Sequence, residues 1–294
     1  MRRIILTICA VMAFGFCGVS VSAQTSVKIW GDNPISPKMN KSEMLVFKAE
    51  NNPSGISAIV CPGGSYRYLG KKVEGTEIAR WLNENGITAF VLYYRTGMRG
   101  NHHPAMIQDL QRTMQLAKEN SAEYGIDPDK VGVMGFSAGG HLVGTLAAYF
   151  DTVFLAELGI TPKVSLRPAF VAMLYPVITM TDESIVHKKS RRNLLSKNYT
   201  PDLAQKMSLE FNVRPDMPPV FLIQCMHDKV VDYRNAVNYA AALKEKNVPH
   251  KFLLFDEPGH GFGIRKGQGE ARKWHLLFIP WLEDVMNVSL PLQK

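Results

Sequence analysis

Outside its N-terminus the sequence has no long apolar run. A helix needs about 18 or more consecutive apolar residues to cross a bilayer, and no such run occurs beyond residue 23. We therefore expect no membrane-spanning helix in the main part of the chain and no membrane partner once the N-terminal segment is removed.

Motifs for metals, nucleotides and nucleic acids are also missing. There is no H-E-x-x-H and no cysteine pair at zinc spacing. His102 and His103 are adjacent, so they do not share one face of a helix or strand. No G-x-G-x-x-G follows a strand pattern, and no arginine-rich tract has interleaved aromatics. The sequence predicts no metal, no cofactor and no nucleic-acid partner.

Cysteine is scarce, and two of the four cysteines lie in the first 23 residues. Cys61 and Cys225 remain, each at the end of an apolar, strand-like run. Two buried free thiols are the favoured interpretation. A disulfide is the alternative, since an oxidising compartment would permit it.

The N-terminal segment has the pattern of a cleavable signal peptide. Arg2 and Arg3 precede an apolar run over residues 4–19, and small residues at 21–23 form a cleavage site after Ala23. The expected product is periplasmic or secreted and comprises residues 24–294. An uncleaved anchor is the alternative. A lipoprotein is disfavoured because Phe14-Gly15-Phe16 before Cys17 is not a lipobox.

From residue 56 onward, short apolar runs alternate with amphipathic patterns. Strands are expected at 56–61, 87–94, 131–135, 170–175, 220–225 and 252–255, and helices at 74–85, 104–124, 138–149, 233–246 and 270–286. Runs that are apolar on both faces and alternate with helices predict one α/β domain, with a mostly parallel twisted sheet covered by helices on both faces. The segment before residue 56 is expected to add antiparallel edge strands.

One segment, residues 178–218, interrupts this alternation. It is polar, too long for an ordinary connection, and carries five cations: Lys188, Lys189, Arg191, Arg192 and Lys197. Long connections of this kind often form lids or binding loops, so a lid-like insert near the active site is expected. A plain solvated basic surface is the alternative.

Ser137 is the centre of the motif G-x-S-x-G at residues 135–139. The motif follows a strand pattern and opens an apolar helix pattern, which is the setting of the nucleophile elbow in α/β-hydrolases. The helix also directs its positive end toward the serine. The sequence therefore predicts an α/β-hydrolase fold with Ser137 as nucleophile.

A nucleophilic serine needs a base and an acid, which follow in the order serine, acid, histidine in this fold. His260 is glycine-flanked and comes just after the last expected strand, so it is the predicted base. Asp228 follows the preceding strand and is the predicted acid, which would orient the imidazole. Asp232 and Asp256 are its rivals.

The oxyanion hole is expected in the loop after the first core strand, which reads Pro-Gly-Gly-Ser-Tyr at 62–66. Glycines let a backbone approach the substrate closely. The predicted donors are the N–H groups of Ala138 and of Gly64 or Ser65. A plain turn is the alternative for Pro-Gly-Gly.

Three motifs together carry a family resemblance: Cys-Pro-Gly-Gly-Ser-Tyr at 61–66, Gly-Phe-Ser-Ala-Gly-Gly-His-Leu at 135–142 and Pro-Gly-His-Gly-Phe-Gly at 258–263. The chain resembles bacterial α/β-hydrolases that include acetylxylan and feruloyl esterases. The resemblance implies a cofactor-free enzyme with its serine after the fifth strand, which removes acetyl or feruloyl groups from plant polysaccharides. In that topology the strands ending at Cys61 and Cys225 are not neighbours, which disfavours a disulfide.

The chain departs from this family around the predicted acid. The family often shows Asp-Asp-x-Val-Val-Pro, whereas residues 227–232 read His-Asp-Lys-Val-Val-Asp. The second aspartate of the pair is retained as Asp228. The change of proline to Asp232 predicts a different loop shape.

These observations predict a serine esterase that acts on an acylated carbohydrate or another small ester. The cations of the insert are expected to contact uronic-acid groups. A prolyl-peptidase-like exopeptidase is one alternative, which the lack of a propeller pattern within these 294 residues disfavours. A non-catalytic α/β-hydrolase-like binding protein is the other, and the intact set of Ser137, Asp228 and His260 disfavours it.

Overall fold

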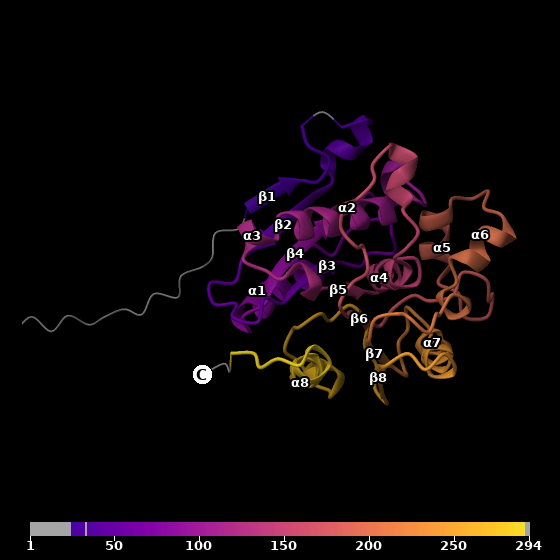
Figure 1. Ribbon diagram of the computed structural model, residues 1–294. Coiled ribbons are helices and arrows are strands. Elements are labelled where there is room, and N and C mark those ends of the chain that lie inside the picture. Colours follow the sequence, from indigo (N-terminus) through magenta and orange to yellow (C-terminus); the bar gives the residue numbers. More distant parts are fainter. Residues whose placement is uncertain (1–24, 33, 292–294) are drawn as a thin grey trace, which may run out of the picture.

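The computed structural model describes residues 25–32 and 34–291 (Figure 1). The expected signal peptide, residues 1–23, lies outside these residues. The described strands form one eight-stranded sheet in the order β1-β2-β4-β3-β5-β6-β7-β8. The strands are β1 (Thr25–Lys28), β2 (Glu43–Phe47), β3 (Ser57–Cys61), β4 (Thr88–Tyr93), β5 (Val131–Phe136), β6 (Val171–Leu174), β7 (Val220–Cys225) and β8 (His250–Phe255).

Strand directions confirm the predicted α/β-hydrolase fold. β2 pairs antiparallel with β1 and β4, which gives the expected antiparallel edge before residue 56. Every later pairing is parallel. All residues of β3, β4, β5, β6 and β7 are buried, because helices cover both faces of the sheet.

Helices pack on the two faces in separate groups. The helices are α1 (Glu77–Glu84), α2 (Ala105–Glu119), α3 (Ser121–Tyr124), α4 (Ala138–Ala148), α5 (Lys188–Leu195), α6 (Pro201–Lys206), α7 (Arg234–Glu245) and α8 (Trp274–Met286). Apolar side chains of α1 and α8 share one core. Those of α2, α4 and α7 share the core on the opposite face. No helix of the described residues is long and apolar enough to cross a membrane.

Three predicted helices differ in their boundaries, and in the one expected at 270–286 a 3-10 turn (Ala271–Lys273) precedes α8. The helix expected at 104–124 breaks at Asn120, whose side-chain amide donates to the Leu116 carbonyl at 2.8 Å and separates α2 from α3. The helix expected at 74–85 starts with a π-helical turn at 72–76, and α1 follows from Glu77. The predicted stop at Gly86 is confirmed, since its φ of 71° lies in the left-handed region.

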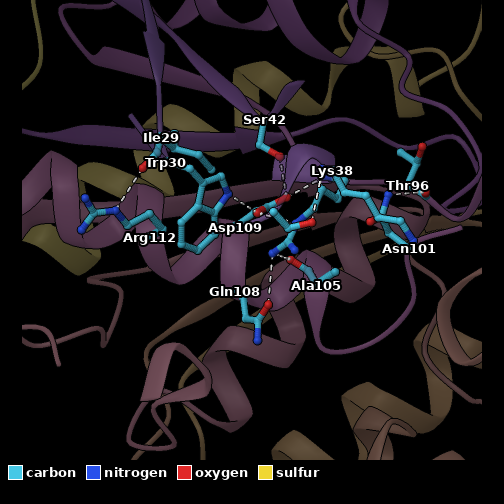
Figure 2. A network of polar contacts seen from close by, with 12 residues as sticks. Ile29, Trp30, Lys38, Ser42, Thr96, Asn101, Ala105, Gln108, Asp109 and Arg112 are labelled. Carbon is cyan, nitrogen blue, oxygen red and sulfur yellow. Dashed lines mark hydrogen bonds and ion pairs between the residues drawn. The ribbon is translucent and has the colours of Figure 1, made fainter. Parts of the chain in front are cut away.

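A buried carboxylate anchors the N-terminal segment to the main body (Figure 2). Asp109 on α2 is fully buried and forms an ion pair of 2.9 Å with Arg95, just after β4. It also accepts the Arg95 backbone N–H at 2.7 Å, the Trp30 indole at 2.8 Å and the Ser42 hydroxyl at 3.1 Å. A buried charge is stable only when it is paired and hydrogen-bonded, and these contacts fulfil both conditions.

The segment between β6 and β7 is less polar than the sequence suggested. It contains α5 and α6, which lie at one edge of the molecule in Figure 1. Its apolar side chains point inward and join the core on the α4 face, among them Ile178, Leu194, Leu195, Ala204, Met207 and Leu209. These contacts seat the insert on the main body with Lys188, Lys189, Arg192 and Lys197 exposed, whereas the Arg191 side chain is only 12% exposed.

The two described cysteines are free and buried, as predicted. Cys61 ends β3 and Cys225 ends β7, and β5 and β6 lie between these strands. Because two strands separate them, no disulfide joins them.

Candidate active site

Ser137 occupies a strained turn between β5 and α4. Its φ of 52° and ψ of −116° are unusual for a residue with a side chain. Flanking glycines make the turn possible. A side chain would not fit at either glycine. A Cβ atom at Gly135 would lie 2.1 Å from the Gly139 carbonyl oxygen, and a Cβ atom at Gly139 would lie 2.0 Å from the Cys61 carbonyl oxygen. The spacing of the motif is therefore dictated by backbone contacts around the serine.

The structure brings the predicted serine, histidine and aspartate together. Oγ of Ser137 lies 2.9 Å from Nε2 of His260, and Nδ1 of that imidazole lies 2.7 Å from Oδ2 of Asp228. The Asp228 side chain is fully buried and that of His260 is 14% exposed. A hydroxyl, an imidazole and a carboxylate thus form one hydrogen-bonded series.

Asp228 is held in place by its own loop. Its Oδ1 accepts the backbone N–H groups of Val230 at 2.8 Å and Val231 at 3.1 Å. Its Oδ2 accepts the side-chain amide of Gln224 at 3.0 Å in addition to the imidazole. These donors stabilise the ionised carboxylate and fix its direction.

The two rival aspartates are engaged elsewhere. Asp232 accepts the backbone N–H of Arg234 at 2.9 Å and pairs with its guanidinium at 2.7 Å, at the start of α7. A carboxylate is favourable at a helix N-terminus, which explains how an aspartate fits where the family often has proline. Asp256 lies 2.9 Å from Nε2 of His227 on the surface.

The loop after β3 lies directly against the serine. A methyl group at Gly63 would lie 2.9 Å from Cβ of Ser137. Ser65 and Tyr66 both have φ of 56°, so the loop turns sharply at these residues. Within residues 25–32 and 34–291, the N–H groups of Gly64, Ser65 and Ala138 have no hydrogen-bond acceptor. They are available to an oxyanion.

Glu74 and Tyr175 belong to the site, although the sequence did not single them out. Oε2 of Glu74 accepts the Gly63 N–H at 2.9 Å, and Oε1 accepts the Tyr175 hydroxyl at 2.9 Å. The Tyr175 oxygen accepts the Gly263 N–H at 3.0 Å, and its ring lies 4.8 Å from the His260 ring between centroids. Burial raises the pKa of Glu74. An acid directly after the glycine loop was the available signal.

His141 was also missed as part of the site. Its Nε2 lies 2.7 Å from the Met207 carbonyl, which can only accept, so Nδ1 accepts the Tyr66 hydroxyl at 2.8 Å. Burial lowers the pKa of His141 to about 4. The neutral imidazole thus joins α4 to the loop after β3 and to the insert. Its signal was a histidine in an otherwise largely apolar helix.

No metal-binding arrangement occurs in the part of the chain that the structure describes, since no three histidine, cysteine, aspartate or glutamate side chains converge there. The groups that can take part in a reaction at this site are side chains and backbone N–H groups. A serine hydroxyl can pass its proton to the imidazole, and nearby N–H groups can stabilise an oxyanion.

Comparison with known proteins gives a family match over most of the sheet. The profile of the BD-FAE family matches residues 46–243. This range includes Ser137, Asp228 and the glycine loop, and it ends before His260.

Two curated relatives have names that refer to xylan. The acetylxylan esterase of Xylanibacter ruminicola is 32% identical over 261 residues, which are 86% of this chain and 49% of that protein. Endo-1,4-beta-xylanase B of Butyrivibrio fibrisolvens is 36% identical over 211 residues, which are 70% of this chain and 32% of that protein. The chain thus spans about half of the first relative and a third of the second.

A solved structure has the same architecture. The acetyl ester-xyloside bifunctional hydrolase from Caldicellulosiruptor lactoaceticus superposes with a TM-score of 0.83 at 30% identity. The match covers 92% of this chain and 100% of that one. The carboxylesterase Cest-2923 from Lactobacillus plantarum superposes at 0.72 with 20% identity, over 91% of this chain and 98% of its own, and supports the fold alone.

Proposed function

The chain belongs to the BD-FAE family of α/β-hydrolases, and we propose from this that it is a serine esterase that removes short acyl groups from plant polysaccharides. The observation that carries the proposal is the hydrogen-bonded series Ser137–His260–Asp228, with distances of 2.9 and 2.7 Å. The names of the acetylxylan esterase and the acetyl ester-xyloside hydrolase support this choice of substrate.

The first half of the proposed reaction forms an acyl-enzyme. Ser137 Oγ attacks the ester carbonyl while Nε2 of His260 takes its proton. Asp228 holds the imidazole with Nε2 free to accept and stabilises the positive charge that forms. The protonated imidazole then gives its proton to the departing sugar hydroxyl.

The second half releases the acid. A water molecule attacks the acyl-enzyme with His260 as general base, and Ser137 is regenerated. In both halves the carbonyl oxygen carries negative charge, which the N–H groups of Ala138 and of Gly64 or Ser65 would stabilise. The positive end of α4 acts in the same direction.

We further propose that the protein is exported. The pattern over residues 1–23 supports cleavage after Ala23, and an exported enzyme would meet polysaccharides outside the cytoplasm. N-terminal sequencing of the protein recovered from the cell envelope or medium tests this. A start at Gln24 is expected, and a retained Met1 would contradict cleavage.

The substrate proposal is tested with a panel of acetylated and feruloylated polysaccharides, scored for released acid. Release of acetate from acetylated xylan, lost in Ser137→Ala, is the expected result. A proline-linked amide in the same panel separates an esterase from a peptidase. Faster cleavage of the amide than of any ester would contradict the proposal.

A further inference from the structure

A cavity of about 430 Å³ lies where the loop after β3 meets α5. Arg67 of the loop and Lys189, Arg192 and Asn193 of α5 line it. Three of these four residues are cations and none is acidic. We call this cavity the basic hollow. Its volume falls in the usual range for small-ligand sites, about 300–1,000 Å³.

The three cations of the basic hollow have no protein counter-charge. Among the described residues, no carboxylate lies within ion-pair distance of any of them. Two other cations of α5, Arg191 and Lys188, do have a carboxylate nearby. Arg191 pairs with Glu183 at 2.6 Å, and Lys188 lies 3.8 Å from the same carboxylate. Gathered like charges repel one another, so an anion entering the hollow would relieve this repulsion.

The basic hollow adjoins the proposed oxyanion loop. The side-chain amide of Asn193 donates to the Ser65 carbonyl at 2.9 Å and to the Lys189 carbonyl at 2.8 Å. Arg67 follows Ser65 by two positions. The amide therefore acts as a support between α5 and the loop, and the cations remain as the groups available to a ligand.

The residue that precedes α5 is within electrostatic reach of the proposed catalytic histidine. His187 immediately precedes α5. Burial lowers its pKa, and the charges of His260 and Lys189 lower it further, whereas Asp228 opposes them. Because Asn193 of α5 donates to Ser65 of the proposed oxyanion loop, a polysaccharide whose ester carbonyl sits at Ser137 would have neighbouring sugars within reach of the basic hollow.

We propose that the basic hollow binds the carboxylate of a uronic-acid residue, which makes acylated acidic polysaccharides the preferred substrates. This inference rests on the proposed esterase function. Acetyl and feruloyl groups are uncharged at their ester linkage, so a negative charge must come from the sugar part. The guanidinium forks of Arg67 and Arg192 match a carboxylate with two parallel hydrogen bonds, and Lys189 adds a third charge.

The test compares two substrates that differ in one charge. One is an acetylated xylo-oligosaccharide with a glucuronic-acid branch, and the other is the same compound with that carboxyl reduced to an alcohol. We expect wild type to show a kcat/KM about 10-fold higher on the acidic compound at low salt, and the ratio to fall toward one at high salt.

The matched variants sit side by side on one helix. Lys189→Gln with Arg192→Gln should reduce the acidic-to-neutral ratio about 5-fold or more, whereas Lys188→Gln, which also removes a cation, should keep it. Circular dichroism establishes that each variant is folded. A charge reversal, Arg192→Glu, should lower the ratio below one.

The possible results distinguish a failure of the uronate site from a failure of the proposed esterase function on which it rests. Hydrolysis of both compounds at one rate, in wild type and variants alike, would overturn the uronate site and leave the esterase intact. An equal loss on both compounds in the double variant would also overturn it, since the cations would then support the loop. Hydrolysis of neither compound, nor of any simple acetyl ester, would contradict the proposed function itself.

Discussion

The Tyr175 hydroxyl donates a hydrogen bond of 2.9 Å to Oε1 of Glu74, and so connects the loop after β3 with the loop that carries His260. Glu74 reaches the first loop through the Gly63 N–H, and Tyr175 reaches the second through the Gly263 N–H. One buried carboxylate therefore positions both sides of the proposed reaction centre.

Glu74→Gln tests this connection. The amide keeps the shape, but its nitrogen cannot accept, so one of the hydrogen bonds from the Gly63 N–H and the Tyr175 hydroxyl must break or reverse, and the oxyanion loop is held less firmly. We expect kcat to fall about 10- to 100-fold with KM little changed. Steady-state kinetics with p-nitrophenyl acetate measures both. Glu77→Gln, three residues further along, is the control. A change in KM alone would refute the positioning role.

Asp228→Asn tests the choice of acid. Asparagine preserves size but favours the wrong imidazole tautomer, so kcat should drop by about 10³-fold or more. Asp232→Asn, at the rival position, should stay within a few-fold of wild type. Comparable losses in the two variants, or a larger loss in Asp232→Asn, would reverse the assignment.

Asp109→Ala tests the buried network that holds the N-terminal segment. Removal of the carboxylate leaves the Arg95 guanidinium and the Trp30 indole without their partner. Breaking such a buried pair costs about 3–5 kcal/mol of unfolding free energy. Urea denaturation measures this loss. Glu183→Ala, which removes a carboxylate that is 63% exposed, should cost much less, and equal losses would contradict the account.

A fully buried and a partly buried histidine, His141 and His103, predict a pH dependence of stability. Burial lowers the pKa of His141 and of His103 from 6.5 to about 4. Between these values the unfolded chain binds protons that the folded chain does not, so stability is full above pH 6.5 and falls as the pH drops toward 4. The fully buried His141 alone accounts for roughly 3 kcal/mol.

The variant His141→Gln isolates one contribution. Its unfolding free energy should vary less steeply with pH than that of wild type over this interval, whatever its absolute stability. Urea titrations at several pH values between 4 and 7 give both slopes. Parallel slopes would show that His141 titrates normally in the folded protein.

The sequence predicted the sheet well because its central strands carry their signal locally. β4 and β7 are buried on both faces and therefore read as continuous apolar runs between turn residues. Ser137 and His260 could be singled out as candidates for a similar reason, since glycines flank each where the backbone must turn or approach closely.

Contacts between distant segments carried no such signal. Tyr175 and Glu74 are 101 positions apart, and no local pattern links them. The insert between β6 and β7 was expected to be polar because its sequence contains many cations. Its apolar residues, which pack against the main body, are less noticeable in the sequence. Its sequence showed where positive charge occurs. Only the fold shows that the two adjacent lysines differ in their surroundings. Lys188 has Glu183 nearby, whereas Lys189 lines the basic hollow.

The most direct test of the central claim is hydrolysis of p-nitrophenyl acetate by wild type and by Ser137→Ala, followed by release of p-nitrophenol. If Ser137 is the nucleophile, wild type turns over steadily and the folded variant loses about 10³-fold or more of its turnover, any residual rate coming from the oxyanion donors and substrate binding. A Ser137→Ala variant that keeps wild-type turnover would contradict the account.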